Sequence, residues 1–299
     1  METLDIQTNG VRLHVNCAGP KDGPLVILLH GFPEMGLSWK HYVEQLGALG
    51  YRVMAPDQRG YGSSDKPEGR LAYRTENLAA DVVGLIDHEH REKASIIGHD
   101  WGAAVAWWVG LQYPDRVERL VTLNVPHPQV FIKRLFTDLG QLRRSWYMFF
   151  FQLPYLPEKA VFKPEGMASQ IRRAIKDKAI ADELLPAYHA AWSQPASQTG
   201  MISWYRAMFL SRPPRNTRLP MPVLVIWGKK DPFLKYEMAY ESLAYCDEGR
   251  LEMIESAGHF VQHDALDEVS QILEDFLAEE RSQKRSERRS ARPKKAASS

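Results

Sequence analysis

The stretch "SIIGHDWGAAVAWW", residues 95–108, limits what this chain can fold into. An apolar run ends in a Gly-x-Asp-x-Gly sequence, in which Gly98 and Gly102 flank Asp100, and a helical pattern follows at once. Small flanking residues allow a sharp turn from a strand into a helix, which leaves the central side chain exposed above a sheet. The stretch therefore predicts a strand, a tight elbow and a helix, with a carboxylate at the position where a serine nucleophile is usual.

Short apolar runs alternate with longer helical patterns over most of the chain. The predicted buried strands lie at 24–31, 51–57, 93–100, 117–126, 221–231 and 250–256, after an opening hairpin around Asn9 and Gly10. Between Pro126 and Pro220 helical patterns continue without a convincing strand. This order predicts an α/β fold with a mostly parallel sheet flanked by helices. Residues 1–125 and 221–280 would form the core, and residues 126–220 an inserted helical cap above the carboxyl edge of the sheet.

Charge is distributed unevenly along the 299 residues. The net charge is +1, but the last stretch, "RSQKRSERRSARPKKAASS", holds eight Lys or Arg residues against one Glu. The preceding part, residues 1–280, therefore carries about −6. With few large apolar residues, the tail 281–299 is expected to be disordered. A basic tail on an acidic domain is more often a solvated terminus than a nucleic-acid site, so we expect no nucleic-acid partner.

The chain shows no sign of a membrane span or a cofactor site. No apolar run approaches the length of about 18 residues that a span needs, and the start resembles no leader peptide. Cys17 and Cys246 match no metal-ligand spacing, and His88 and His90 lack a third ligand. The glycines of "RGYGSS" do not form a phosphate loop. We therefore expect a cytoplasmic protein with free thiols, no metal and no cofactor, acting as a monomer or homodimer.

Two further residues complete a catalytic pattern with Asp100. Asp231 ends the predicted strand "VLVIWGKKD", and His259 follows the last predicted strand in "ESAGHFVQ". An α/β-hydrolase requires this order of nucleophile, acid and histidine at three strand ends. A single aspartate here could be a helix cap and a single histidine a structural group, but the combination favours a catalytic site. His99 and His30 are expected to be structural.

Four separated motifs resemble the epoxide hydrolases of the α/β-hydrolase fold: "HGFPE" at 30–34, "RGYGSSDKP" at 59–67, "GHDWG" at 98–102 and "GHFVQ" at 258–262. The resemblance covers nearly the whole chain short of its tail. It implies two cap tyrosines that hold the epoxide oxygen, and the matching segments are "SWYMFFFQLP" with Tyr147 and "SWYRAMF" with Tyr205. It also implies an oxyanion hole made by the backbone N–H groups of Phe32 and Trp101, and a cis bond between Phe32 and Pro33.

The chemistry explains why these residue types occur together. A carboxylate can open an epoxide by attack on a saturated carbon, which leaves an alkyl ester on the enzyme. A phenol, with an ordinary pKa of about 10, can protonate the emerging alkoxide at neutral pH. His259, oriented by Asp231, would then activate the water that hydrolyses the ester. Apolar walls from Phe32, Trp101, Phe151 and Met208 would suit a hydrophobic epoxide, with water as the second substrate.

Two other functions remain open from the sequence. A haloalkane dehalogenase uses the same Asp nucleophile, and Trp101 would suit a halide, but Phe32 stands where that pattern tends to have Asn, and two cap tyrosines would be superfluous. A fluoroacetate-type dehalogenase would carry Arg in place of Trp101. A non-catalytic receptor on this fold would commonly lack the nucleophile or the histidine, and both are present here.

Overall fold

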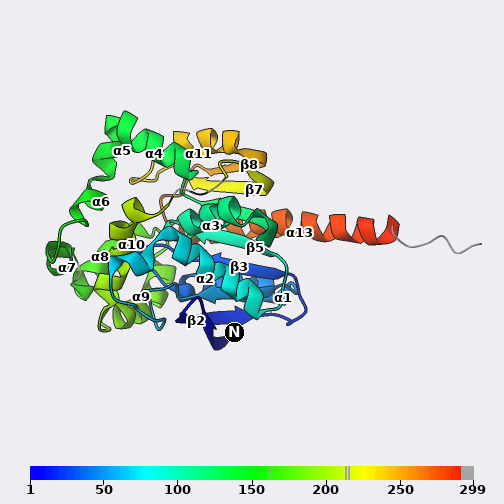
Figure 1. Cartoon of the computed structure of the whole chain (residues 1–299), viewed down its shortest axis with the longest axis horizontal. Helices are drawn as coiled ribbons and strands as arrows, with labels where there is room; N and C mark the ends of the chain where they lie inside the picture. The colour runs from blue at the N-terminus through cyan, green and yellow to red at the C-terminus, as the bar shows by residue number, and fades with distance from the viewer. Residues whose placement is uncertain (162, 213, 215, 291–299) are drawn as a thin grey trace, which may run out of the picture.

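An eight-stranded sheet forms the centre of the computed structural model, which describes residues 1–161, 163–212, 214 and 216–290 (Figure 1). The order of the strands across the sheet is β1-β2-β4-β3-β5-β6-β7-β8. The strands are β1 (Glu2–Thr8), β2 (Val11–Ala18), β3 (Leu25–Leu29), β4 (Arg52–Pro56), β5 (Ala94–His99), β6 (Val117–Leu123), β7 (Leu219–Gly228) and β8 (Cys246–Ile254).

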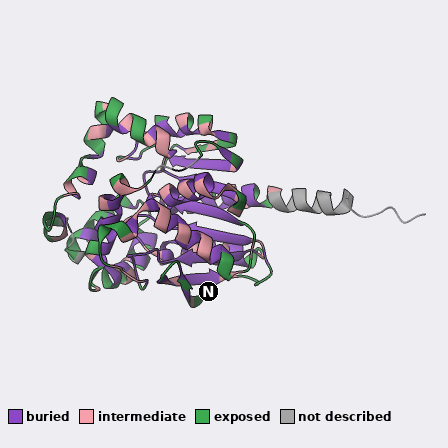
Figure 2. Ribbon diagram, in the orientation of Figure 1, coloured by how far each residue is buried: buried purple, intermediate pink, exposed green. Residues whose placement is uncertain are grey.

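The sheet is parallel from β4 to β8 and antiparallel at its first edge. Asn9 and Gly10 both have positive φ angles, as a two-residue hairpin turn between β1 and β2 requires. All residues of β3, β4 and β5 are buried, because helices cover both faces of the central strands (Figure 2). The predicted hairpin and the predicted α/β fold are confirmed.

Two apolar clusters lie on opposite faces of the sheet. Alternate residues of β3 separate into them, so that Val26 packs with α1 (Lys40–Ala48) and α13 (Leu266–Ser290), and Ile27 packs with α2 (Thr75–His88) and α3 (Trp101–Gln112). The remaining helices of this part are α11 (Glu237–Ser242), α12 (Val261–Asp264), η1 (Gly36–Trp39), η2 (Arg70–Tyr73), η3 (Pro114–Arg116) and η5 (Leu243–Tyr245).

The described residues between β6 and β7 form helices joined by turns, with no strand among them. These cap helices lie at one end of the sheet, on the left in Figure 1. They are α4 (Pro128–Thr137), α5 (Leu139–Arg144), α6 (Trp146–Phe150), α7 (Leu156–Val161), α8 (Pro164–Ala174), α9 (Lys178–Trp192), α10 (Ser197–Ala207) and η4 (Met208–Leu210). Strand β7 begins at Leu219, slightly before the boundary expected at residue 221.

Helix α13 differs from the sequence prediction. It continues to Ser290, so the expectation of disorder from residue 281 onward is wrong for residues 281–290. Scarcity of apolar residues suggested disorder, but Arg, Lys, Glu and Gln are good helix formers and can extend a helix whose first turns are anchored in the core. The rest of the predicted tail, residues 291–299, lies outside the described residues. Within the described part of the chain, no helix has the length and apolar character needed to cross a membrane.

A buried ion pair explains part of the "RGYGSSDKP" motif. Arg59 donates from Nε and Nη2 to the two carboxylate oxygens of Asp81 on α2, at 2.8 and 2.6 Å. Both side chains are almost fully buried, and the Arg59 carbonyl accepts a hydrogen bond from the Trp204 indole in α10. The motif therefore joins the loop after β4 to the core and to the cap helices.

We expect Arg59→Met to lower the free energy of unfolding by about 3 kcal/mol, because it leaves the Asp81 carboxylate buried without its charged partner. Urea denaturation measures this change. The matched control is Arg172→Met, which removes a cation from the half-exposed pair with Asp182 and should cost less than about 1 kcal/mol. Equal losses for the two variants would contradict this role of the buried pair.

Candidate active site

Asp100 occupies the turn between β5 and α3, at a backbone conformation that is rare for residues other than glycine. Its φ is 49° and its ψ is −123°. The flanking glycines are required by close approach of the chain: a Cβ on Gly98 would collide with the backbone of Gly102, and a Cβ on Gly102 with the backbone of Leu29. The sequence "GHDWG" thus forms the predicted elbow, and the turn directs the Asp100 side chain beyond the carboxyl end of the sheet.

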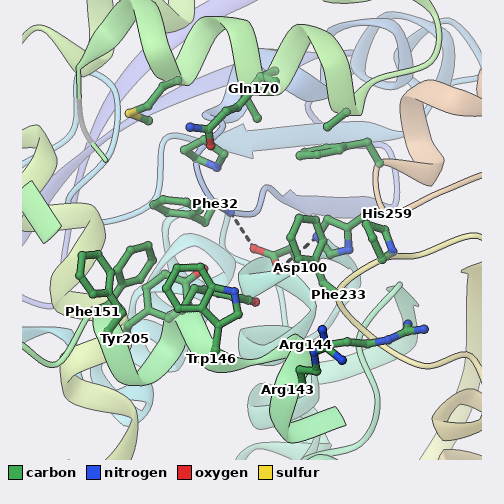
Figure 3. Close-up of a pocket in the computed structure, with 18 of the residues that line it drawn as sticks. Phe32, Asp100, Arg143, Arg144, Trp146, Phe151, Gln170, Tyr205, Phe233 and His259 are labelled. Carbon is green, nitrogen blue, oxygen red and sulfur yellow. Dashed lines mark hydrogen bonds and ion pairs between the residues drawn. The ribbon is translucent and has the colours of Figure 1, made fainter. Parts of the chain in front are cut away.

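The two carboxylate oxygens of Asp100 have different surroundings (Figure 3). Oδ1 accepts a hydrogen bond of 2.8 Å from the Phe32 backbone N–H, and Oδ2 lies 3.4 Å from Nε2 of His259. Burial alone would raise the pKa of Asp100, but the nearby His259 and the Phe32 N–H outweigh it and lower the pKa below its ordinary value. The carboxylate is therefore ionised at neutral pH.

The loop that carries Phe32 is fixed from several sides. The Phe32–Pro33 peptide bond is cis, as the resemblance to epoxide hydrolases implied. The Pro33 carbonyl accepts a 2.7 Å hydrogen bond from the Trp192 indole of α9. His30 accepts from the Gln58 backbone N–H through Nε2, at 3.0 Å, in keeping with its expected structural part. The expected second donor, the N–H of Trp101, belongs to the first residue of α3, directly after Asp100.

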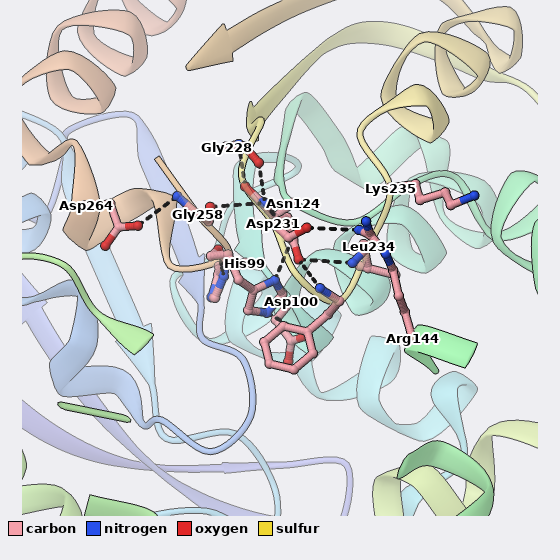
Figure 4. A network of polar contacts seen from close by, with 12 residues as sticks. His99, Asp100, Asn124, Arg144, Gly228, Asp231, Leu234, Lys235, Gly258 and Asp264 are labelled. Atoms are coloured by element: carbon pink, nitrogen blue, oxygen red, sulfur yellow. Dashed lines mark hydrogen bonds and ion pairs between the residues drawn. The ribbon is translucent and has the colours of Figure 1, made fainter. Parts of the chain in front are cut away.

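Asp231 and His259 lie together beside Asp100 (Figure 4). Nδ1 of His259 is 2.7 Å from Oδ2 of Asp231, and the Asp231 side chain is fully buried. The backbone N–H groups of Phe233 and Leu234 donate to the other oxygen of Asp231, at 2.7 and 3.0 Å. The structure thus brings the three predicted residues into contact, and His259 lies between the carboxylates of Asp100 and Asp231.

Asn124 is a site residue that the sequence reading missed. Its side-chain amide donates to Asp231 Oδ2 at 2.7 Å, and its Oδ1 accepts from the Gly228 backbone N–H at 2.9 Å. It is fully buried and follows β6, the strand between those that carry Asp100 and Asp231. Its position directly after a buried strand, at the same edge of the sheet as the catalytic residues, was the available signal.

The sequence reading also missed Glu34 of the "HGFPE" motif, whose carboxylate is buried. It accepts hydrogen bonds from Tyr188, at 2.8 Å, and from Gln262, at 3.1 Å, and its Oε1 lies 2.7 Å from His263 Nε2. Burial opposes its charge, but His263 and His99 outweigh this and hold its pKa far below the ordinary value. An ionised Glu34 therefore lies in the core behind the site.

His99 connects this buried network to His259. Its Nδ1 accepts from the Gln262 side-chain amide at 3.1 Å, so its Nε2 carries the proton and donates to the His259 carbonyl at 2.8 Å. His99 is fully buried and positions the backbone of His259, which agrees with its expected structural role.

Burial and two neighbouring carboxylates act in opposite directions on the protonation of His259. Burial lowers its pKa, but the carboxylates of Asp231 and Asp100 outweigh burial and raise the pKa to about 10. His259 is therefore protonated in the resting site at neutral pH. Neutralising Asp100 would remove one of the two carboxylates that hold the proton.

A cavity of about 930 Å³ opens above Asp100 and His259. Its walls are mainly apolar, with Phe32, Phe151, Trp146 and Phe233 among them, and Arg143, Arg144 and Gln170 also reach it (Figure 3). A smaller cavity of about 150 Å³, which also includes Asp100 in its lining, is lined by Trp101 and Met208. The four predicted pocket residues are therefore divided between two cavities.

Tyr147 and Tyr205 line both cavities together with Asp100. Their ring centroids lie 6.0 Å apart. Burial, together with the nearby Asp100 carboxylate, raises the pKa of each phenol well above the ordinary value of 10. The rings of Trp101 and Tyr205 pack edge to face, with their centroids 5.0 Å apart.

Neither thiols nor metal ligands gather near this site. Cys17 and Cys246 are both free and buried. Among the residues that the structure describes, no group of three or more His, Cys, Asp or Glu side chains could hold a metal ion. The arrangement places a carboxylate, an imidazole and two phenols at one cavity.

Comparison with known proteins points to one family. The α/β-hydrolase fold family matches residues 24–266. The chain is 36% identical over 287 residues to epoxide hydrolase 4 of Mus musculus, an alignment that covers 92% of this chain and 79% of the relative. The chain belongs to the epoxide hydrolase family. The family and the fold inferred from the four sequence motifs are therefore confirmed.

Other relatives agree with this membership. The chain is 40% identical over 280 residues to AB hydrolase superfamily protein YfhM of Bacillus subtilis, covering 91% of this chain and 96% of the relative. Its fold matches epoxide hydrolase A from Mycobacterium thermoresistibile with a TM-score of 0.78 and 33% identity, covering 93% of this chain and 98% of that structure. The epoxide hydrolase of Bacillus megaterium superposes with a TM-score of 0.83 at 27% identity, with 92% and 100% coverage.

We expect the proton on His259 to make stability depend on pH. Its pKa in the folded enzyme, about 10, exceeds the unfolded value of about 6.5. The protonated form therefore adds stability that is complete below about pH 6.5 and is lost as the pH rises through about 10. The free energy of unfolding, measured by urea denaturation, should fall over this range in the wild type and fall less in His259→Gln. Parallel curves for the two proteins would contradict the raised pKa.

Proposed function

We propose that Asp100 opens a hydrophobic epoxide by forming an alkyl ester, and that water activated by His259 hydrolyses this ester to a vicinal diol. One observation carries the proposal: the ionised Asp100 carboxylate lies between a backbone donor and His259, at cavities that it shares with two protonated phenols. The step from carboxylate to ester requires a saturated electrophilic carbon, and an epoxide supplies it.

Oδ2 of Asp100 is the proposed attacking oxygen. Oδ1 is already held by the Phe32 N–H, so attack through Oδ2 would leave Oδ1 as the carbonyl oxygen of the ester with its donor in place. When water later attacks the ester carbon, negative charge would develop on Oδ1. The Phe32 N–H, with the N–H of Trp101 as the second donor, would stabilise that charge.

Tyr147 and Tyr205 are the proposed acids for ring opening. The alkoxide that emerges is far too basic to leave without a proton or a hydrogen bond. Both phenols keep their protons at neutral pH, because burial and the Asp100 charge raise their pKa values. The edge-to-face contact with the Trp101 ring, at a centroid distance of 5.0 Å, holds the Tyr205 ring beside Asp100.

His259 is the proposed base of the second step. In the resting site two carboxylates keep it protonated, with a pKa of about 10. Esterification removes the charge of Asp100, so the pKa of His259 falls and the imidazole can release its proton. Asp231, fixed by Asn124 and two backbone N–H groups, remains to stabilise the imidazolium that forms when His259 takes a proton from water. Ester formation would thus prepare the base for ester hydrolysis.

The cavity supports a bulky substrate. A volume of about 930 Å³ is near the upper end for small-molecule sites, and its mainly apolar walls favour a hydrophobic epoxide.

In this proposal residues 126–220 form the cap domain that supplies both tyrosines. Two buried free thiols support a reducing, cytoplasmic location. Conversion of a reactive epoxide to a diol would serve detoxification.

We expect His259→Gln to form the ester but fail to hydrolyse it. The carboxylate can attack without a base, whereas water at the ester requires one. Intact-mass spectrometry after reaction with a fast epoxide should show one added epoxide, and peptide mapping should place it on Asp100. Asp100→Asn in the same experiment is the control and should remain unmodified. An unmodified His259→Gln enzyme would contradict the division of roles.

We expect the two tyrosines to act jointly in ring opening. Each single change, Tyr147→Phe or Tyr205→Phe, leaves one donor and should slow alkylation by a factor on the order of ten to a thousand. The double variant should lose far more, while hydrolysis of a preformed ester should be largely unaffected. Pre-steady-state alkylation rates with an epoxide and with a haloalkane measure these effects. An unchanged ring-opening rate in the double variant would exclude the tyrosines as acids, and fast halide release would favour a dehalogenase.

A further inference from the structure

The exposed apolar side chains of this protein are concentrated on one part of the cap. Of the thirteen exposed large hydrophobic side chains among the described residues, eight fall within residues 132–156. The four most exposed are Leu139 at 82%, Tyr155 at 77%, Phe136 at 69% and Trp146 at 63%. Single exposed apolar residues are normal, but a concentration of this kind marks an interaction surface.

The segment that carries these side chains runs along the outer edge of the cap, from α4 through α5 and α6 to α7 (Figure 1). Ile132 and Phe136 share one face of α4, because they are four residues apart. Phe149 of α6 stacks on Phe209, which is itself half-exposed, with ring centroids 6.4 Å apart. We call this surface, helices α4 to α7 with Phe209, the apolar rim.

The cap is also strongly basic. Residues 126–220 contain fourteen Lys and Arg residues against six Asp and Glu residues, whereas residues 1–125 and 221–280 contain sixteen against thirty. On the rim, Lys133, Arg143 and Lys159 are exposed. The two rim carboxylates, Asp138 and Glu158, already pair with Lys235 and Arg206. The rim therefore combines exposed aromatic residues with positive charge, whereas the core formed by residues 1–125 and 221–280 carries an excess of acidic residues.

The rim also reaches the active site. Trp146, Arg143 and Gly140 line the large cavity above Asp100, and Ile132 lines the smaller one. A hydrophobic epoxide that is dissolved in a lipid layer would therefore find the mouth of the cavity at the same surface that the lipid contacts. A second copy of this chain would bring an equally basic surface against the rim, which disfavours that occupant.

We propose that the apolar rim binds the surface of an anionic lipid membrane and takes epoxide substrate from it. Trp146, Tyr155 and Phe136 enter the headgroup region, where amphipathic and aromatic side chains are favoured, and the rim cations contact the anionic headgroups. The acidic core faces away from the membrane. The delivery of substrate rests on the proposed function, whereas membrane binding does not.

Vesicle sedimentation tests the binding. The probe is a phosphatidylcholine vesicle with about 30% phosphatidylserine, and wild-type protein should sediment with it at low salt and be released at about 0.5 M salt. Leu139→Asp should weaken partitioning by about tenfold or more, because it replaces the most exposed apolar side chain by a charge of the same sign as the lipid. The matched control is Leu49→Asp at the end of α1, away from the cap, which should sediment like the wild type.

The outcomes separate the explanations. The proposal is overturned if the wild type stays in the supernatant, and also if Leu139→Asp sediments like the wild type. The second result would assign binding to another surface. One such surface is the end of α13, which extends from the opposite side of the sheet (Figure 1). Dimeric wild type that Leu139→Asp converts to monomer, without vesicle binding, would assign the rim to a second copy and also overturn it.

Turnover distinguishes a failure of the rim from a failure of the proposed function. Leu139 lines neither cavity, so Leu139→Asp should hydrolyse a water-soluble epoxide at the wild-type rate and lose rate only with an epoxide presented in vesicles. Equal rates with the vesicle-bound epoxide would contradict substrate uptake from the membrane. Wild type that hydrolyses no epoxide would instead refute the proposed function, and sedimentation would still report on the rim.

Discussion

The Asp100 carboxylate extends beyond the carboxyl end of the sheet only because the chain turns at a conformation that its neighbours make possible. A φ of 49° at a residue with a side chain costs free energy of order 1–3 kcal/mol, and the packed strand and helix on either side supply it. Gly98 and Gly102 have no room for a Cβ, so the backbones of β5, α3 and the loop after β3 approach one another closely. The same approach places the Phe32 N–H against the carboxylate.

Beyond the Asp100 turn, buried carboxylates and the groups that donate hydrogen bonds to them determine how the site is arranged. Asp100 and Asp231 hold one proton on His259, and the Glu34 carboxylate, in contact with His263, lies beneath it and is joined to His259 through Gln262 and His99. Buried carboxylates are costly unless they are paired and hydrogen-bonded, which explains why donors surround each of them. In the proposed mechanism, ester formation removes the negative charge of Asp100 and so lowers the proton affinity of His259.

The sequence alone predicted the features that depend on which residues directly follow each strand along the chain. Asp100, Asp231 and His259 each follow a buried strand, and parallel strands end at one edge, so their meeting was predictable. Asn124 and Glu34 were missed because their importance lies in contacts with residues about a hundred or more positions away along the chain. The division of Phe32, Phe151, Trp101 and Met208 between two cavities depends on how the cap helices pack. The prediction ended helix α13 too early, because the scarcity of large apolar residues after residue 280 indicated disorder. The helix propensity of the Arg, Lys, Glu and Gln residues there favoured a continued helix.

The central claim is that the oxygen first added to the epoxide comes from Asp100 and not from water. A single turnover in heavy-oxygen water, with enzyme in excess over a hydrophobic epoxide, tests it most directly. The account predicts an unlabelled diol in the first turnover and heavy oxygen in the Asp100 carboxylate, because water attacks the ester carbon and its oxygen remains on the enzyme. Heavy oxygen in the first diol, with an unlabelled Asp100, would show direct attack of water on the epoxide and would contradict the ester mechanism.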